Sequence, residues 1–389
     1  MLRGRLVTSG SVVDDGVVTV VGDRVAYAGP ATEWEGAGWD GELPPPAPDR
    51  LLLPGLVDVH CHGAAGHGFP DDDADGVLAA AAHHRAHGTT TLVASLVSAP
   101  AAVLRERLAL LAPLVRSGEL AGVHLEGPFL SAVRCGAQDP AALVPGDPAL
   151  LRELLAEGTV VSMTLAPETA HADELVAVLR EHGVLPSFGH TDAGAGATTA
   201  AIRAAAVTGP LSATHLFNGM PPLLSRAPGP VAACLAAAAR GELVLELIGD
   251  GVHLAPETVA TVFDLVGPGQ IALVTDAMAA AGMADGRYRL GALPVEVSGG
   301  VARLVTDDGP GAIAGGTARL IDVVRQTVAA GVPLADAVLS ATATPAALLG
   351  RSDVGHLAAG ARADVLVTDA RLTPTAVLRA GRWVQREES

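Results

Sequence analysis

The chain contains the run Leu53-Pro54-Gly55-Leu56-Val57-Asp58-Val59-His60-Cys61-His62-Gly63. Residues 56–59 are apolar and β-branched enough to predict a buried strand. The strand ends in His60 and His62, and residues two apart on a strand point to the same face. Imidazole is a common ligand for zinc and iron, so the pair is a candidate metal site. An isolated pair of this kind is more often a surface or core feature, so the rest of the chain must decide.

Composition and charge limit the classes of function. With 389 residues, of which 49% are hydrophobic, the chain is long enough for one large domain and a small one. Its formal net charge of −17 argues against nucleic acid and an anionic membrane as partners, although a local arginine can still hold a phosphate. All 25 basic residues are arginine. A carboxylated lysine is therefore excluded, and a ligand shared by two metals must be an aspartate or a glutamate.

The cysteines and the apolar segments indicate a compartment. Cys61, Cys135 and Cys234 are odd in number and far apart, which argues against a disulfide framework and a thiolate zinc site. No apolar stretch approaches the ~18 residues of a membrane span, and the N-terminus has no signal-peptide pattern. We therefore expect a cytoplasmic protein.

The middle of the chain alternates between short apolar runs and stretches of helical length. The eight runs lie at 55–60, 90–95, 122–126, 160–165, 185–190, 211–215, 243–249 and 271–275. This alternation predicts an α/β fold, a (β/α)8 TIM-type barrel over residues 51–354. A doubly wound open sheet is the alternative, but it rarely places polar ligand-type residues after so many strands. An inserted hairpin is expected at about 285–308, with strands at 287–290 and 301–305.

The two ends of the chain are rich in strands. Residues 17–21 and 24–28 flank a Gly-Asp turn signal, and residues 363–369 form another β-branched run near the C-terminus. We expect residues 1–50 and 355–389 to form one small β-sandwich domain beside the barrel.

Ligand-type residues follow the predicted strands. In a barrel of this kind the carboxyl ends of the strands meet at one rim, where the chemistry takes place. The residues there are His60, His62, His124, Glu126, His190, His215, Asp250, His253 and Asp276. Each alone has an ordinary structural explanation, such as a helix cap for Asp276. Together they predict a catalytic metal site that acidifies a bound water, with His124 in support and Asp276 as general acid and base. This chemistry indicates metal-assisted hydrolysis of an amide-like bond.

Several longer motifs add a resemblance. They are His124-Leu125-Glu126-Gly127-Pro128-Phe129, Gly189-His190-Thr191, Thr214-His215-Leu216-Phe217-Asn218-Gly219-Met220, Asp250-Gly251-Val252-His253 and Val274-Thr275-Asp276-Ala277. With the first run, they resemble the amidohydrolase superfamily and, more closely, the N-acetylglucosamine-6-phosphate deacetylases.

The resemblance implies a metal site and a substrate pocket. Glu126, His190 and His215 would hold the principal metal, His60 and His62 would hold a second, and Asp276 would be a further metal ligand. The ions would be divalent, with one or two per subunit. Zinc is the expected metal, and iron and manganese are the alternatives. Asn218 and Gly219 would contact a phosphate through backbone amides, and His253 would contact the sugar phosphate. Arg226 would hold the phosphate across a homodimer interface. The remaining implied pocket residues are Ala137, Gln138, Asp250, Ala312, Ile313, Ala314 and Gly315.

One departure concerns Gln138, because the family usually has a histidine at this point. Glutamine donates and accepts hydrogen bonds but cannot carry a positive charge. The expected reaction is removal of the N-acetyl group from N-acetylglucosamine 6-phosphate by metal-bound hydroxide, giving glucosamine 6-phosphate and acetate. The alternative is a sibling hydrolase that acts on N-acetylgalactosamine 6-phosphate or on an unphosphorylated N-acyl amine. A barrel retained only for binding is disfavoured, because every ligand-type residue is present.

Overall fold

The computed structural model describes residues 1–8, 10–307 and 309–384. Its centre is an eight-stranded parallel sheet in the order β14-β13-β12-β11-β10-β9-β8-β5. The strands are β5 (Leu56–Asp58), β8 (Thr89–Leu96), β9 (Gly122–Glu126), β10 (Val160–Leu165), β11 (Leu185–Phe188), β12 (Ser212–Ala213), β13 (Val244–Leu247) and β14 (Ile271–Leu273). Each lies within or close to one of the eight apolar runs of the sequence.

Hydrogen bonds join the first and last strands and close the sheet into a barrel. The Thr275 hydroxyl donates to the buried Asp58 carboxylate at 2.6 Å. One residue further on, the Asp276 N–H donates to the His60 carbonyl at 2.9 Å. These contacts lie at the end of β5 and just after β14, so closure itself brings Asp276 next to His60.

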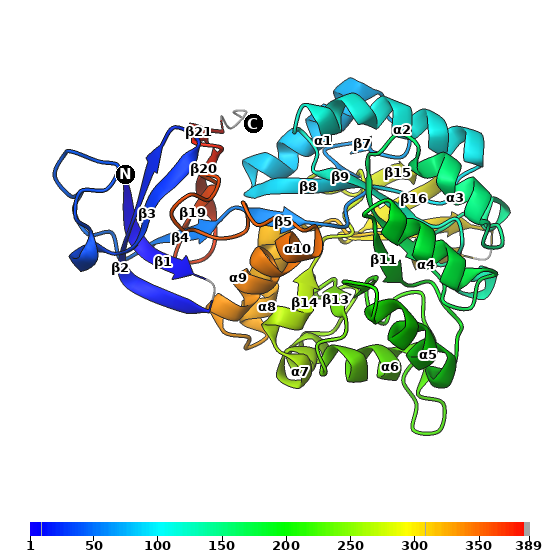
Figure 1. Cartoon of the computed structure of the whole chain (residues 1–389). Coiled ribbons are helices and arrows are strands. Elements are labelled where there is room, and N and C mark those ends of the chain that lie inside the picture. Colours follow the sequence, from blue (N-terminus) through cyan, green and yellow to red (C-terminus); the bar gives the residue numbers. More distant parts are fainter. Residues whose placement is uncertain (9, 308, 385–389) are drawn as a thin grey trace.

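Helices cover the outside of the barrel (Figure 1). They are α1 (Ala74–Ala86), α2 (Ala101–Arg116), α3 (Pro148–Leu155), α4 (Ala172–Glu181), α5 (Ala195–Ala206), α6 (Gly229–Ala238), α7 (Pro256–Val266), α8 (Leu320–Ala329), α9 (Leu334–Ser340) and α10 (Ala343–Leu348). In α2 the residues Leu104, Leu108 and Leu111 recur at helical spacing and are buried. Each such leucine contributes about 1.5–3 kcal/mol by leaving water. Short 3-10 helices are η1 (Ala31–Glu33), η2 (Ala132–Arg134), η3 (Pro140–Ala142) and η4 (Pro268–Gln270).

Both ends of the chain contribute to a second, seven-stranded sheet, at the left of Figure 1. It consists of β1 (Leu2–Thr8), β2 (Ser11–Val21), β3 (Arg24–Pro30), β4 (Arg50–Pro54), β19 (Val365–Asp369), β20 (Pro374–Arg379) and β21 (Arg382–Trp383). Its order is β21-β20-β19-β4-β1-β2-β3, and all its pairs are antiparallel except β1 with β4. The Val25 N–H on β3 donates to the Ala361 carbonyl, and both residues belong to one buried apolar cluster of this part of the chain.

The insertion after β14 is larger than the predicted hairpin. Four antiparallel strands form it: β15 (Gly286–Leu290), β16 (Leu293–Ser298), β17 (Val301–Thr306) and β18 (Gly309–Ile313). The prediction included the first and third of these strands and omitted β16, where apolar residues alternate with polar ones. It also omitted β18, whose Gly-Pro-Gly start has no strand signal. A small pair, β6 (Gly63–Ala64) with β7 (His67–Gly68), follows the first histidines.

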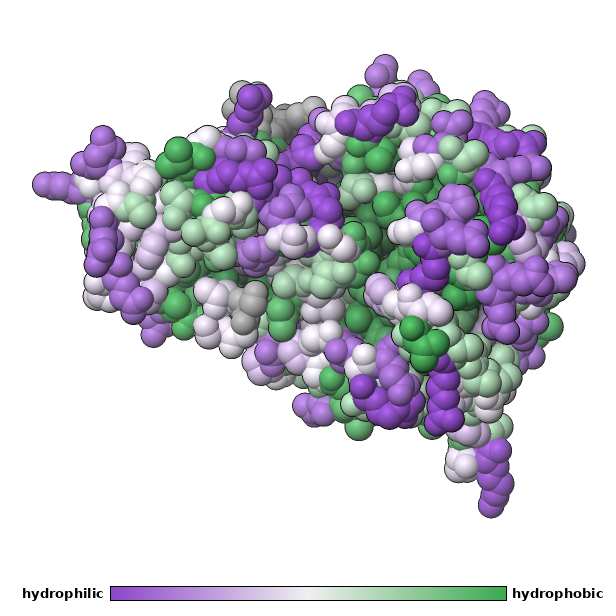
Figure 2. Space-filling view, in the orientation of Figure 1, coloured by the Kyte–Doolittle hydropathy of each residue, from purple (hydrophilic) through white to green (hydrophobic). Residues whose placement is uncertain are grey.

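The surface is mixed in character. Figure 2 shows hydrophilic side chains over both the barrel and the terminal sheet, with smaller hydrophobic areas between them. Among the residues that the structure describes, no helix has the length and apolar character needed to cross a bilayer.

Candidate active site

The ligand-type residues predicted from the sequence converge at the carboxyl ends of the barrel strands. His60 and His62 follow β5, Glu126 ends β9, and His190 follows β11. His215 follows β12 and Asp276 follows β14. The side chains of all six are largely buried. His190, His215 and Asp276 have φ angles of 46°, 27° and 46°. Left-handed backbone of this kind is strained in non-glycine residues and is concentrated at functional sites.

The principal cluster consists of Glu126, His190 and His215. The Glu126 Oε1 atom lies 2.9 Å from Nε2 of both histidines, and the two Nε2 atoms are 3.1 Å apart. The His190 Nδ1 atom lies 2.8 Å from the Arg134 carbonyl, an acceptor only, so Nδ1 carries the proton. The His190 Nε2 lone pair therefore points at the other two side chains.

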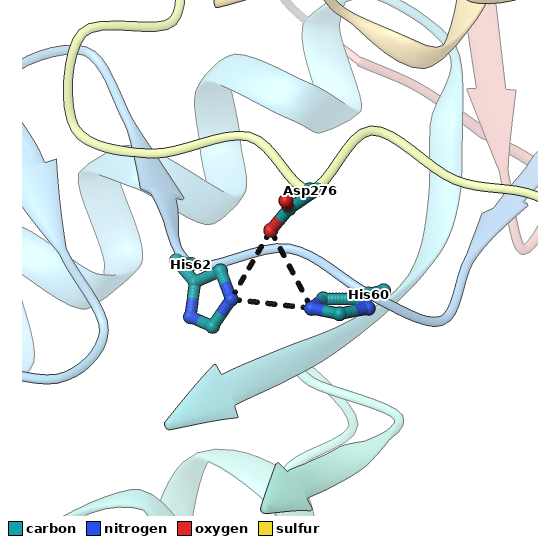
Figure 3. A group of neighbouring side chains, drawn as sticks. All are labelled: His60, His62 and Asp276. Carbon is teal, nitrogen blue, oxygen red and sulfur yellow. Dashed lines mark hydrogen bonds and ion pairs between the residues drawn. The ribbon is translucent and has the colours of Figure 1, made fainter. Parts of the chain in front are cut away.

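The second cluster consists of His60, His62 and Asp276, which Figure 3 shows pointing toward one another. The Nε2 atoms of His60 and His62 are 3.2 Å apart, and Asp276 Oδ1 lies 3.4 and 3.3 Å from them. Glu126 lies between the clusters, because its Oε2 atom is 3.2 Å from His62 Nε2. The Glu126 carboxylate is therefore placed to be a shared ligand.

The donor set of both clusters fits a divalent cation. The outer nitrogens of His60 and His62 face the Glu246 carboxylate at 3.0 Å and the Ser95 carbonyl at 3.1 Å, so both Nδ1 atoms carry protons. Without a second proton on either ring, the two Nε2 lone pairs face each other at 3.2 Å, which is repulsive unless a cation lies between them. Imidazole and carboxylate together suit zinc, iron and manganese.

The electrostatic field of the site also favours positive charge. Burial opposes the charged form of His60, but the nearby Glu126 and Asp276 carboxylates outweigh it and raise the pKa of His60 well above its ordinary value. Burial likewise opposes ionisation of Asp276, but His60 and His62 overcome it and lower the pKa of Asp276 to about 2. Asp276 is therefore ionised at neutral pH and able to accept a proton.

His253 approaches the second cluster from the other side. Its Nδ1 atom lies 2.8 Å from Asp250 Oδ2, and its Nε2 atom lies 4.0 Å from Asp276 Oδ2. Asp250 Oδ1 also accepts the His253 backbone N–H at 2.8 Å. Asp250 therefore orients His253, whose ring lines the cavity described next.

A cavity of about 280 Å³ opens over the clusters. It is lined by five of the six cluster residues and by the predicted pocket residues Ala137, Gln138, Asn218, Gly219, His253, Ala312, Ile313 and Gly315. Three other predicted residues do not line it. Ala314 is fully buried, Asp250 lies behind His253, and Arg226 lies in the exposed loop 222–228. In the part of the chain that the structure describes, the cavity lining contains no arginine.

Two predicted pocket residues have their polar groups engaged within the protein. The Gln138 amide donates to Glu126 Oε2 at 2.7 Å, and its oxygen accepts the Ser98 N–H at 2.7 Å. The Asn218 backbone N–H donates to the His215 carbonyl at 3.0 Å. Gln138 therefore holds a carboxylate of the site, and Asn218 stabilises the turn that follows His215.

The sequence analysis missed some residues that support the clusters, notably Glu246 and Ser95. Both hold a histidine ring through Nδ1, as described above. The signal was present for Glu246, because a charged residue within an apolar strand needs a partner. His124, predicted to lend support, has its ring centre 4.6 Å from that of His60. Its ring nitrogens contact the Ser95 and Thr164 hydroxyls at 3.0 and 2.8 Å.

Comparison with known proteins places this geometry in a family. The model of the amidohydrolase family matches residues 51–385. The chain belongs to the amidohydrolase family. Members of this family depend on metal, which agrees with the two clusters of metal-ligating side chains.

Individual amidohydrolases show a closer relationship. The chain is 33% identical to the N-acetylglucosamine-6-phosphate deacetylase of Bacillus subtilis (strain 168), over 77% of this chain and 75% of that protein. It is 34% identical to the N-acetylgalactosamine-6-phosphate deacetylase of Escherichia coli O157:H7, over 83% and 85%. The resemblance seen in the sequence motifs is thereby confirmed.

A solved structure shares the whole architecture. It is a variant of the N-acetyl-D-glucosamine-6-phosphate deacetylase from Mycobacterium smegmatis with one aspartate replaced by alanine, in complex with N-acetyl-D-glucosamine-6-phosphate. It has 41% sequence identity and a TM-score of 0.88, and the match covers 98% of this chain and 97% of that one. The predicted barrel with a small β domain is confirmed.

Proposed function

We propose that this amidohydrolase removes the N-acetyl group from N-acetylglucosamine 6-phosphate, giving glucosamine 6-phosphate and acetate. One observation carries the proposal: two histidine–carboxylate clusters share Glu126 at the floor of a cavity that also contains the ionised Asp276. Relatives with 33–41% identity that bear the name of this activity support the choice of substrate.

The clusters would hold one or two divalent cations. Zinc is the expected metal, and iron and manganese are the alternatives. The principal cluster would bind one ion and the second cluster the other, with Glu126 between them. Such a cation acidifies a bound water and polarises the acetyl carbonyl.

Asp276 and His253 would act on the substrate itself. The Asp276 carboxylate would accept a proton from water and return it to the sugar nitrogen as the amide bond breaks. His253, held by Asp250, would donate from Nε2 to the sugar phosphate. We propose that the backbone of Gly219, where φ is 61°, approaches the phosphate. Ala312 and Ile313 of the inserted sheet would cover the sugar.

Arg226 would supply the cation that the phosphate needs, from a second copy of the chain. The loop 222–228 is exposed and extends from the barrel at the bottom of Figure 1. It also exposes Leu223 and Leu224, by 47% and 55%. Exposed leucines beside an arginine suit an interface, and the enzyme's own cavity lining contributes no arginine among the described residues. We therefore propose a homodimer.

We place the enzyme in the cytoplasm, because its three unpaired cysteines suit a reducing compartment.

The Arg226→Ala variant tests this role. We expect KM for phosphorylated substrates to rise about 10- to 100-fold, because a hydrogen bond to a charged group contributes about 1.5–3 kcal/mol. The slower turnover of unphosphorylated N-acetylglucosamine should not change. Steady-state kinetics on both sugars measures this, with Arg116→Ala, an exposed arginine of α2, as the matched control. An equal rise in KM for both sugars would show that Arg226 does not recognise the phosphate.

Gln138 provides a second prediction. Replacement by leucine leaves the Ser98 N–H unpaired and releases Glu126, so zinc affinity should fall about 10- to 100-fold, as for other partners of metal ligands. Competition titration against a coloured chelator measures the affinity, with the exposed Gln326→Leu as control. Unchanged zinc affinity with a higher KM would instead assign Gln138 to substrate recognition alone.

N-acetylgalactosamine 6-phosphate is the second candidate substrate, favoured by the E. coli relative with 34% identity. Acetate release from the 6-phosphates of N-acetylglucosamine and N-acetylgalactosamine, and from both free sugars, decides between the candidates. We expect the highest kcat/KM for N-acetylglucosamine 6-phosphate. A higher kcat/KM for N-acetylgalactosamine 6-phosphate would make that sugar the substrate. A higher kcat/KM for a free sugar would show that the enzyme does not recognise the phosphate.

A further inference from the structure

Glu246 is a buried carboxylate whose presence the fold does not explain. It lies on β13 within the barrel and is 4% exposed. Burying a carboxylate is costly unless it is paired, and apolar residues are often the more stable choice at such positions. The polar contacts recorded for its side chain are the His60 ring and the His215 backbone N–H. One contact is with a residue of the second cluster and the other is with a residue of the principal cluster.

The same oxygen serves both clusters. Glu246 Oε2 lies 3.0 Å from His60 Nδ1 and 3.4 Å from the His215 backbone nitrogen. A carboxylate accepts but cannot donate, so His60 must carry its proton on Nδ1 and present Nε2 to His62 and Asp276. The contact with His215 holds the main chain at a residue with a φ angle of 27°, where the backbone is strained.

Glu246 differs from the other groups that hold the histidine rings. His62 and His190 are held by the carbonyl oxygens of Ser95 and Arg134, which are neutral. His60 is held by a carboxylate, which is a stronger acceptor and makes the opposite ring nitrogen a better electron donor.

We infer that Glu246 is a positioning residue that fixes the ring of His60 in the second cluster and the main chain of His215 in the principal one. It touches neither substrate nor the reacting atoms. The inference rests on the proposed function, because it assumes that both clusters bind metal. Its consequence is that the second cluster binds its ion tightly only when residue 246 accepts a hydrogen bond.

Cobalt(II) binding tests the inference without an activity assay. Full-length Glu246→Leu and Glu246→Gln are titrated with Co²⁺, and the equivalents bound and the visible spectrum are recorded. We expect the leucine variant to bind the second equivalent of Co²⁺ about 10- to 100-fold more weakly. The absorption bands that arise from the second ion should then be lost from the visible spectrum. The glutamine variant, whose amide oxygen still accepts, should fall between leucine and wild type. The first equivalent should be weakened less than the second, because the contact of Glu246 with the His215 main chain is the longer one, at 3.4 Å.

The control is Asp364→Asn, which changes a buried carboxylate paired with Arg362, away from both clusters. It should bind cobalt like wild type. If the leucine variant does not fold, the glutamine variant gives the decision on its own. Wild-type cobalt affinities and spectra in a folded Glu246 variant would overturn the inference. Wild-type protein that bound no cobalt would instead overturn the proposed function, and the inference with it.

Discussion

Replacement of Asp276 by asparagine should lower kcat for N-acetylglucosamine 6-phosphate by about 10²- to 10⁴-fold, the usual contribution of a general acid–base group. Asparagine has the shape of aspartate but cannot accept a proton from water or return it to the leaving nitrogen. In the unchanged protein His60 and His62 overcome the effect of burial and keep the pKa of Asp276 near 2, so the group is an ionised carboxylate at neutral pH.

The kinetics of this variant need a metal measurement on the same sample. Asp276 belongs to the second cluster only, so the ion held by Glu126, His190 and His215 should remain. Asp264→Asn, at an exposed position of α7, is the matched control and should leave kcat unchanged. Turnover at the wild-type rate in the Asp276→Asn variant would exclude the proposed acid–base role.

Glu126→Gln should have the second large effect, the loss of metal from both clusters. One carboxylate oxygen contacts His190 and His215, and the other lies 3.2 Å from His62 Nε2. Glutamine keeps the size but replaces one oxygen with an NH₂ group that cannot bind a cation. We expect metal affinity to fall by more than the ~100-fold seen when a partner of a ligand is changed.

Metal content after dialysis, measured together with acetate release, tests this result. Both should fall in parallel, and excess zinc should restore activity only in part. Glu153→Gln, which removes an exposed carboxylate that pairs with Arg105 on α2, is the control. A Glu126→Gln variant that kept its full metal content would show that Glu126 is not a shared ligand.

The sequence predicted the barrel and the ligand residues because both depend on a simple pattern. Apolar runs alternate with helical stretches, and closure of a parallel sheet brings the carboxyl ends of all its strands to one rim. Residues as distant as Glu126 and His215 therefore meet, with Glu126 Oε1 2.9 Å from His215 Nε2.

Other features depend on directions that no linear pattern contains. Glu246 stands out as a charged residue in an apolar strand, but its partners could not be identified from the sequence, because its side chain reaches residues that follow two other strands, β5 and β12. Gln138 was predicted as a pocket residue and lines the cavity, but the sequence does not show that its amide also contacts Ser98 and Glu126. In the insertion, β18 begins with Gly-Pro-Gly, and pairing with β17 outweighs its weak intrinsic preference for a strand.

The position of the metal decides whether these side chains gather around a shared cation. Crystals grown with zinc, measured on both sides of the zinc absorption edge, should give anomalous difference peaks beside the Nε2 atoms of His190 and His215. A second peak is expected between His60, His62 and Asp276 when the second ion is bound. Zinc found only elsewhere, or imidazoles of residues 60, 190 and 215 turned away from the Glu126 carboxylate, would contradict the metal site proposed for this fold.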